Sequence, residues 1–209
     1  MGGSDAYQSI LSRGMVQREI CYLSAAITMN IHTFICNPYS ECTYLVYGLP
    51  SEPEANCYII DPGMYTDKEK QLFLTFIQEN RLEPKAVLIT HKHPDHVCGL
   101  EYIQNLYPTI PVMNNQSEWV NMPCERLLTP GHKEDAVCYY FKDSSTLFSG
   151  DTLFMESVGR TDLPGGDFET LKHSIHTLIT TLPDDTTIYP GHGPKTTIAH
   201  EKQYNPFYL

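Results

Sequence analysis

Three histidines and one aspartate lie within six positions of the sequence, in the segment THKHPDH at residues 90–96. The segment follows the apolar run AVLI, so His91, His93, Asp95 and His96 come where a buried strand is expected to end. Imidazole nitrogens and carboxylate oxygens are the usual ligands of zinc and similar ions. In an extended segment His91 and His93 point the same way and can bind one ion together. The proline that follows turns the chain, so Asp95 and His96 point elsewhere, which makes two ions more natural than one.

The remaining ligands of two such ions must come from later segments. His132 in TPGH, Asp151 in FSGD and His192 in YPGHG each follow an apolar strand and have a glycine beside them that lets the backbone turn. A single His or Asp at a strand end is more often a turn or cap residue. We assign that role, or a surface position, to four other histidines: His32, His173, His176 and His200.

The elements that must position these residues recur in two halves. Strands are expected at 31–36, 42–48 and 57–63 as an antiparallel meander, followed by a helix at 66–82, a strand at 85–90 and a helix at 99–107. The second half predicts strands at 126–129, 136–142, 146–150 and 186–190, with helices at 168–182 and 196–204. This order favours two sheets packed face to face with helices on their outer faces. We expect one domain over 29–209, preceded by an N-terminal extension over 1–28.

Composition and charge restrict the class of protein. The chain has 209 residues, of which 41% are hydrophobic and 19% charged, as in globular proteins. The net charge of −11 and the absence of a basic run argue against nucleic acid or a membrane as partner. The seven cysteines are scattered, which favours a reduced, cytoplasmic protein. Residues 18–30 resemble a signal peptide only weakly, so export is not expected.

Five motifs together carry a family resemblance. In order, THKHPDH, TPGH, SGDTLF, GRTDLPGGD and YPGHGPKTT resemble the metallo-beta-lactamase superfamily, and especially its short glyoxalase II-like hydrolases. The resemblance runs from about Ile31 to the carboxyl terminus. It implies an α/β (α+β) fold, the four-layer αβ/βα sandwich of the metallo-beta-lactamase fold, with a two-metal site at one edge. By position, it implies that Asp151 bridges two ions, with His91, His93 and His132 on the first and Asp95, His96 and His192 on the second.

Some positions depart from the family pattern. Lys133 and Asp135 stand where the family commonly has Thr and Gly, and Cys98 stands where Gly is frequent. These changes keep every ligand and bear on substrate contacts and loop shape; Cys98 is interpreted as a packing residue in a turn. Full glyoxalase II enzymes carry a further helical domain that supplies much of the glutathione site. The sequence ends before such a domain, so the use of glutathione stays open.

The resemblance implies a binuclear metal-dependent hydrolase that cleaves a thioester of glutathione or of another thiol. Two divalent ions, zinc with iron or manganese as alternatives, would share a water and hold it as the attacking hydroxide. Asp151 and Asp95 are the expected catalytic carboxylates, Asp151 by setting the separation of the ions and Asp95 as a ligand rather than a general base. The expected partner is a small-molecule thioester, and the chain is expected to be a monomer or a homodimer.

Other functions stay open on the sequence. Persulfide dioxygenases resemble the same pattern, but bind one iron through two histidines and an aspartate and use oxygen. A lactonase or other ester hydrolase, a lactamase, and a metal-binding module without catalysis are further alternatives. Within GRTDLPGGD, Arg160 is expected to pair with Asp162, and Asp167 to cap the next helix. Tyr189 and Lys195 could contact a substrate or cover a strand end.

Overall fold

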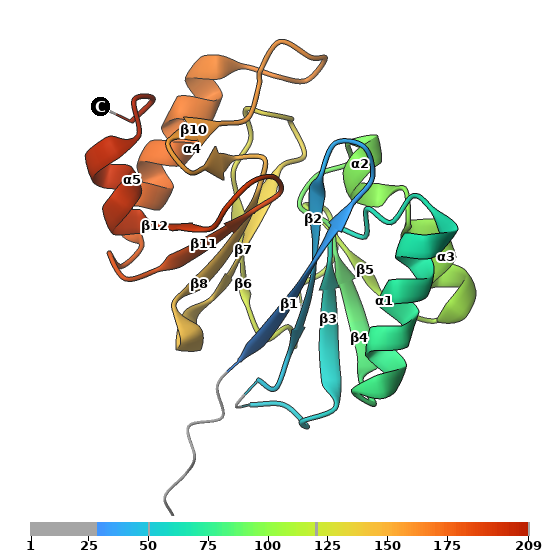
Figure 1. Cartoon of the computed structure of the whole chain (residues 1–209). Coiled ribbons are helices and arrows are strands. Elements are labelled where there is room, and N and C mark those ends of the chain that lie inside the picture. Colours follow the sequence, from blue (N-terminus) through green and yellow to red (C-terminus); the bar gives the residue numbers. More distant parts are fainter. Residues whose placement is uncertain (1–28, 50, 120, 209) are drawn as a thin grey trace, which may run out of the picture.

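Two five-stranded sheets lie side by side in the computed structural model, which describes residues 29–49, 51–119 and 121–208 (Figure 1). The first sheet has the order β1-β2-β3-β4-β5, which is also the order along the chain. The pairs β1/β2 and β2/β3 are antiparallel, which confirms the predicted meander, while β4 pairs in parallel with β3 and β5. Its strands are β1 (Asn30–Cys36), β2 (Glu41–Tyr47), β3 (Asn56–Ile60), β4 (Glu83–Leu88) and β5 (Val112–Met113).

The second sheet has the order β12-β11-β8-β7-β6. The pair β8/β11 is parallel and the other three pairs are antiparallel. Its strands are β6 (Glu125–Leu128), β7 (Val137–Phe141), β8 (Thr146–Gly150), β11 (Thr187–Pro190) and β12 (Thr196–Thr197). A separate two-stranded ribbon, β9 (Leu153–Phe154) with β10 (Ser157–Val158), follows β8.

Helices cover the outer face of each sheet (Figure 1). The helices α1 (Asp67–Glu79) and α3 (Leu100–Leu106) lie on the first sheet, and α4 (Phe168–Thr181) and α5 (Ile198–Tyr204) lie on the second. Two short helices, α2 (Pro94–Val97) and η1 (Lys142–Ser144), lie in the connections. Among the described residues, no helix is long and apolar enough to cross a membrane.

Alternation along the strands explains the four layers. Tyr44 of β2 faces the second sheet and shares a core with Tyr139 and Phe148. The next residue, Leu45, points to the opposite face and packs with Phe73 of α1. Because successive side chains of a strand point to opposite faces, strands that are apolar on both faces must be covered on both. The predicted αβ/βα sandwich is therefore confirmed.

Local sequence explains where the helices begin. Thr66 and Glu69 form a capping box, in which each side chain accepts from the backbone N–H of the other. Asp167 accepts from the Thr170 N–H at the start of α4, which confirms its predicted cap. The helix expected at 196–204 starts later, because Thr196 and Thr197 pair with β11 and Thr197 then caps α5.

Two differences from the sequence-based predictions matter for the site. The strand expected at 85–90 already ends at Leu88, which leaves Thr90 outside the strand. The short helix α2 was not predicted, and it carries two of the expected ligands. The extension over 1–28 lies outside the described residues, and the single domain over 29–209 stays a prediction.

Candidate metal centre

All seven predicted ligand residues meet at one edge of the sandwich. Four lie in the connection that follows β4 of the first sheet, in or next to α2. Three lie in connections of the second sheet, after β6, directly after β8 and after β11. Pro94 is the first residue of α2, so the chain changes direction there as predicted, although the helix itself was not expected. The residues are His91, His93, Asp95 and His96 from the first sheet, and His132, Asp151 and His192 from the second.

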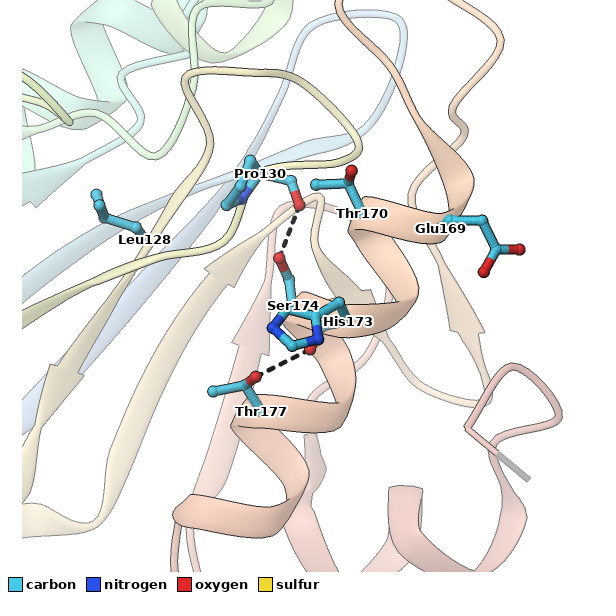
Figure 2. A pocket seen from close by; sticks show the side chains of 7 residues that line it. All are labelled: Leu128, Pro130, Glu169, Thr170, His173, Ser174 and Thr177. Carbon is cyan, nitrogen blue, oxygen red and sulfur yellow. Dashed lines mark hydrogen bonds between the residues drawn. The ribbon is translucent and has the colours of Figure 1, made fainter.

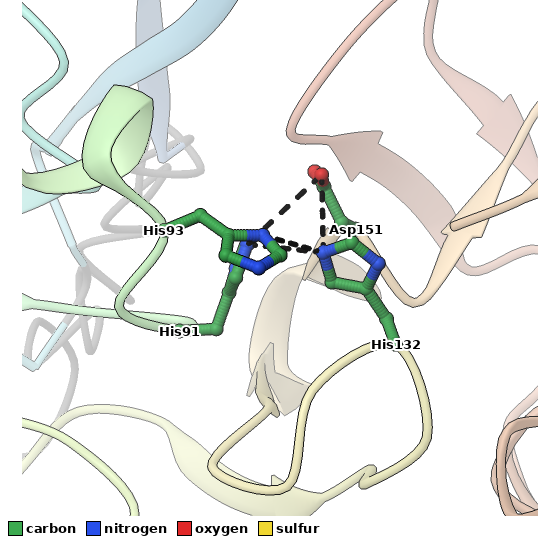
Figure 3. Close-up of side chains that lie close together, drawn as sticks. All are labelled: His91, His93, His132 and Asp151. Carbon is green, nitrogen blue, oxygen red and sulfur yellow. Dashed lines mark hydrogen bonds and ion pairs between the residues drawn. The ribbon is translucent and has the colours of Figure 1, made fainter. Parts of the chain in front are cut away.

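Three imidazoles and one carboxylate form the first ligand set (Figure 3). His93 Nδ1 lies 3.0 Å from His91 Nε2 and 2.9 Å from His132 Nε2, and the two Nε2 atoms are 3.3 Å apart. Asp151 Oδ2 lies 3.5 Å from His132 Nε2 and 4.0 Å from His91 Nε2. Zinc to nitrogen bonds of about 2.05 Å give a ligand tetrahedron with edges of about 3.3 Å, so these four atoms stand at ligand spacing.

Asp95, His96 and His192 form the second ligand set. His192 Nε2 lies 3.3 Å from Asp95 Oδ2, and His96 Nε2 lies 3.9 Å from the same oxygen.

Asp151 contacts both sets with one carboxylate. Its Oδ1 lies 3.2 Å from His96 Nε2, and its Oδ2 lies 3.6 Å from His192 Nε2 as well as near the first set. The His96 Nε2 and Asp151 Oδ1 atoms are buried and form no aligned hydrogen bond with described residues. Buried polar atoms without partners are rare in proteins, and here they face one another across the two sets. The His/Asp cluster therefore fits a dimetal site.

Burial and neighbouring charges shift the histidine pKa values of the two sets in different directions. Burial, together with the neighbouring imidazoles, lowers the pKa of His91 well below its usual value, and the same causes lower the pKa of His93. Neutral imidazole is the form that binds a metal ion. For His96 burial also opposes protonation, but the Asp151 and Asp61 carboxylates prevail and raise its pKa. Despite its burial, Asp151 has a lowered pKa because His96 and His192 stabilise its ionised form.

Asp61 and Thr90 support one histidine of each set, and sequence reasoning did not single them out. Asp61 accepts from the Thr90 N–H at 2.7 Å, from the Thr90 hydroxyl at 2.5 Å and from His96 Nδ1 at 2.9 Å. Because the only hydroxyl proton of Thr90 goes to Asp61, its oxygen accepts from His91 Nδ1 at 3.1 Å. Both rings therefore carry a proton on Nδ1 and direct Nε2 to the cluster. The signal was an Asp after an apolar strand in CYIIDPG, the same pattern as FSGD.

Backbone carbonyls orient two further imidazoles. His132 Nδ1 donates to the Arg160 carbonyl at 2.7 Å, and His192 Nδ1 donates to the Tyr39 carbonyl at 3.1 Å. A carbonyl oxygen only accepts, so these contacts also fix the tautomer that presents Nε2 to the cluster.

Glu41 lies beside the second set and was not predicted. It is fully buried, accepts from the Thr43 hydroxyl at 2.9 Å and forms a third group with Asp61 and His96. Burial raises the pKa of Glu41 well above its usual range, which favours the neutral form of this side chain.

The other polar residues that the sequence singled out lie outside the cluster. Arg160 pairs with both carboxylate oxygens of Asp162, at 2.7 and 2.6 Å, as predicted. Tyr189 stacks on Phe148 and lies under the Lys195 ammonium, which favours the structural role for both. His32 stacks on Phe76, His200 pairs with Glu156, and His173 and His176 are exposed on α4.

The prediction for Cys98 is half right, because the residue lies in the turn after α2 but its side chain is not packed. Its side chain is exposed, because His96 takes the buried position of the single-turn helix α2. The Cys98 thiol donates to the Gly63 carbonyl at 3.0 Å. The other five described cysteines are buried and free, as expected for small core residues.

A cleft of about 500 Å³ opens onto the cluster. It is lined by five of the ligand residues and by Tyr39, Pro94, Phe154, Arg160 and Leu163. A separate groove of about 460 Å³ lies along α4 and contains His173 and Glu169 (Figure 2). None of the three groups of potential metal ligands found among the described residues includes a side chain of that groove. The chemistry therefore belongs to the first cleft.

Comparisons with known proteins agree with this geometry. Residues 42–117 and 125–192 match the Metallo-beta-lactamase superfamily. A probable metallo-hydrolase of Bacillus subtilis is 36% identical over 187 residues, which cover 72% of this chain and 86% of that protein. The hydroxyacylglutathione hydrolase GloC of Haemophilus influenzae is 30% identical over 215 residues, which cover 86% of this chain and 98% of that protein.

Solved structures show the same fold. The BLEG-1 B3 metallo-beta-lactamase superposes with a TM-score of 0.75 at 30% identity, over 86% of this chain and 99% of that one. TTHA1623 in a di-iron-bound form superposes with a TM-score of 0.72 at 30% identity, over 84% of this chain and 99% of that one. ETHE1 from Myxococcus xanthus superposes with a TM-score of 0.71 at 28% identity, over 85% of this chain and 84% of that one.

Proposed function

The chain belongs to the metallo-beta-lactamase superfamily, and we propose that it is a binuclear metal-dependent hydrolase that cleaves thioesters. The observation that carries the proposal is the Asp151 carboxylate, which lies within 3.2 to 4.0 Å of imidazole nitrogens from both ligand sets. A carboxylate in this position would supply a ligand oxygen to an ion in each set. The di-iron-bound form of TTHA1623 supports the same stoichiometry.

We assign one ion to each of the two ligand sets. His91, His93 and His132 would hold the first ion, Asp95, His96 and His192 the second, and Asp151 both. Zinc suits a set rich in imidazole, and iron and manganese are the alternatives. When bound, two such ions supply Lewis acidity, which lowers the pKa of water and polarises a carbonyl group.

The side chains around the cluster hold the reacting groups rather than exchange protons with them. Asp95 and Asp151 have lowered pKa values despite partial or full burial, because His192 and His96 stabilise their ionised forms. They are therefore ligands and not acids at neutral pH. Among the described residues that line the cleft, those that are not ligands include no carboxylic acid. A thioester suits such a site, because a thiolate leaves without a proton from a general acid.

The relatives support the substrate class. A hydroxyacylglutathione hydrolase is similar to this chain along nearly its whole length. We propose a small-molecule thioester as the substrate, with no nucleic acid or membrane as partner, and a monomer or homodimer as the active form. The buried free cysteines favour a reduced compartment, which leads us to propose the cytoplasm.

A substrate panel tests the proposal. The purified chain is loaded with zinc and assayed for thiol release from thioesters, for hydrolysis of lactones and β-lactams, and, with iron, for oxygen uptake with a persulfide. We expect thioester turnover that requires metal and far exceeds the other activities. Iron-dependent oxygen uptake without thioester cleavage would reassign the protein to persulfide oxidation. A fully metallated chain that is inactive toward the whole panel would contradict catalysis.

A further inference from the structure

The cleft beside the candidate metal centre has an apolar wall. Five of its ten lining residues are proposed ligands. Of the remaining five, Tyr39, Pro94, Phe154 and Leu163 present aromatic or aliphatic surface, and Arg160 is the only charged one. Ligand pockets are commonly lined by apolar side chains with a few polar groups that orient the ligand. Most of the polar groups here are those of the metal centre itself, and the others are the Arg160 guanidinium and the Tyr39 hydroxyl.

The charge of Arg160 is already compensated. Its guanidinium makes two parallel hydrogen bonds to Asp162, at 2.7 and 2.6 Å, and both side chains are more than half exposed. A bidentate pair of this kind satisfies the planar fork of the guanidinium. The described lining therefore offers no unpaired cation for a carboxylate of the substrate, and what remains to contact the acyl group is mainly apolar surface.

Tyr39 is an exposed aromatic side chain on a fixed backbone. Its relative exposure is 74%, yet its carbonyl accepts from His192 and its N–H donates to the Asn37 side chain at 3.0 Å. Asn37 in turn donates from Nδ2 to the carbonyls of Gly63 and Asp95, both at 3.0 Å. The β1–β2 loop is thus tied to two residues of the second ligand set, and a ring presented by a preorganised loop loses little conformational entropy when it contacts a ligand.

Leu163 and Phe154 continue the apolar wall from the second half of the chain. Leu163 is 37% exposed in the loop before α4. Phe154 of β9 packs edge to face on the His192 ring, with the centroids 6.2 Å apart. The wall therefore draws on both halves of the sandwich and meets at the ligand edge.

From these observations we infer that the site selects thioesters with an apolar acyl chain, which binds against Tyr39, Phe154 and Leu163. This inference rests on the proposed thioesterase function and adds a substrate class to it. A hydroxyl on the acyl group would lose its water contacts against this wall, whereas each added methylene gains contact. One methylene in a hydrophobic pocket commonly changes kcat/KM by about 10-fold or more.

The experiment compares acyl groups on one neutral thiol. The zinc-loaded full chain is assayed with acetyl, butyryl, hexanoyl and lactoyl thioesters of N-acetylcysteamine. We expect kcat/KM to rise at least about 10-fold from acetyl to hexanoyl and to be lower for lactoyl than for butyryl. Tyr39→Ala and Leu163→Ala should reduce the ratio of hexanoyl to acetyl about 10-fold, whereas Tyr39→Phe should keep it. The control Leu106→Ala changes another exposed leucine, on α3, and should leave all rates unchanged.

Binding without turnover separates this inference from the proposed function. Calorimetry with the corresponding alkyl thioethers, which cannot be hydrolysed, reports the acyl preference directly. Equal kcat/KM for all acyl groups, or a loss in Tyr39→Ala that is the same for every thioester, would overturn the apolar selection while the thioesterase stands. Chain-length-dependent thioether binding without hydrolysis of any thioester would support the apolar wall and contradict the proposed function.

Discussion

At the scale of single residues, one buried carboxylate supports both ligand sets. Asp61 contacts His96 directly and reaches His91 through the Thr90 hydroxyl. All four side chains are almost completely buried. The backbone of Asp61 is left-handed, with φ of 46°, which a non-glycine residue adopts only where the surroundings hold it. The three hydrogen bonds to its carboxylate supply that constraint.

The two arms of this network can be separated by mutation. Thr90→Val removes the hydroxyl but keeps the shape of the side chain, so it should weaken the ion of the first set by about 10- to 100-fold and spare the second. Asp61→Asn should weaken both. Thr90→Ser keeps the hydroxyl and serves as the control. Competition with a chromophoric chelator measures the two affinities, and an equal loss at both sites in Thr90→Val would contradict the separate arms.

The sequence could predict the ligands but not this support. His91, His93 and the other ligands lie in segments whose composition and order are characteristic of a family. Asp61 and Thr90 are ordinary residues in the sequence, and they acquire a role only because the parallel pairing of β3 with β4 places their strand ends together. Tyr39 lies between the strands predicted at 31–36 and 42–48, and nothing in its local sequence indicated a role. Its place in the cleft depends on the long-range contacts of Asn37 and His192.

At the scale of elements, the turn after β11 must pass very close to the metal centre. A Cβ on Gly191 would lie 2.3 Å from Asp151 Oδ1 and 2.6 Å from His96 Cε1. No heavy atom lies within 4 Å of a Cβ built on Gly193 in the same turn, but φ there is +81°. The two glycines are thus required for different reasons, the first for space and the second for backbone conformation.

This difference predicts that alanine at Gly191 affects metal binding, whereas alanine at Gly193 affects stability. Gly191→Ala should lower the affinity for both ions by at least about 10-fold, because Asp151 and His96 must move. Gly193→Ala should cost about 1–2 kcal/mol of unfolding free energy from the left-handed backbone, with unchanged metal affinity. Metal titration and denaturant unfolding of both variants check the pair. Tight metal binding by Gly191→Ala would contradict the close approach.

The start of α1 predicts a pH effect. The Glu69 carboxylate accepts from the N–H groups of Tyr65, Thr66 and Asn37, and despite partial burial these hydrogen bonds lower its pKa. A lowered pKa means stabilisation that is present above the unfolded value of about 4.3 and is lost as the pH falls through the folded value. Glu69→Gln should therefore be less stable than wild type at pH 7, and the difference should shrink below about pH 4.

Unfolding of both metal-free proteins by urea across this pH range checks the effect. Comparing metal-free chains makes the titration of the ligand histidines common to both. A stability difference that does not change with pH would contradict a role for the ionised carboxylate.

The predicted elements were mostly confirmed, and the boundaries show what local sequence leaves out. An apolar run such as KAVLIT does not reveal where pairing begins and ends, since β4 spans Glu83–Leu88 and its limits depend on the neighbouring strands. The four residues of α2 are too few for a helical period and gave no periodic signal.

At the scale of the whole molecule, the candidate metal centre connects the two sheets. The first sheet and α2 supply four ligand residues and the second sheet supplies three. Ions held there would bind the folded chain and not the unfolded one, so they would add to the free energy of unfolding.

Removal of metal should therefore lower the thermal stability of the whole chain. A site filled at 100 times its Kd contributes about 2.7 kcal/mol, so two sites correspond to a fall in Tm of about 10 °C or more on chelation. Differential scanning calorimetry with and without a chelator measures this, and readdition of zinc should restore the Tm. A Tm that does not change on chelation would contradict ions that join the sheets.

The most direct test of the account is the metal content of Asp151→Ala. One carboxylate contacts both ligand sets, so its loss should remove both ions and the thioesterase activity together. Asp185→Ala, which changes an exposed aspartate, is the control. Elemental analysis should find two ions per chain in wild type and in the control, and fewer than one in Asp151→Ala. Two ions retained in Asp151→Ala, or one ion in fully loaded wild type, would contradict a binuclear centre built on Asp151.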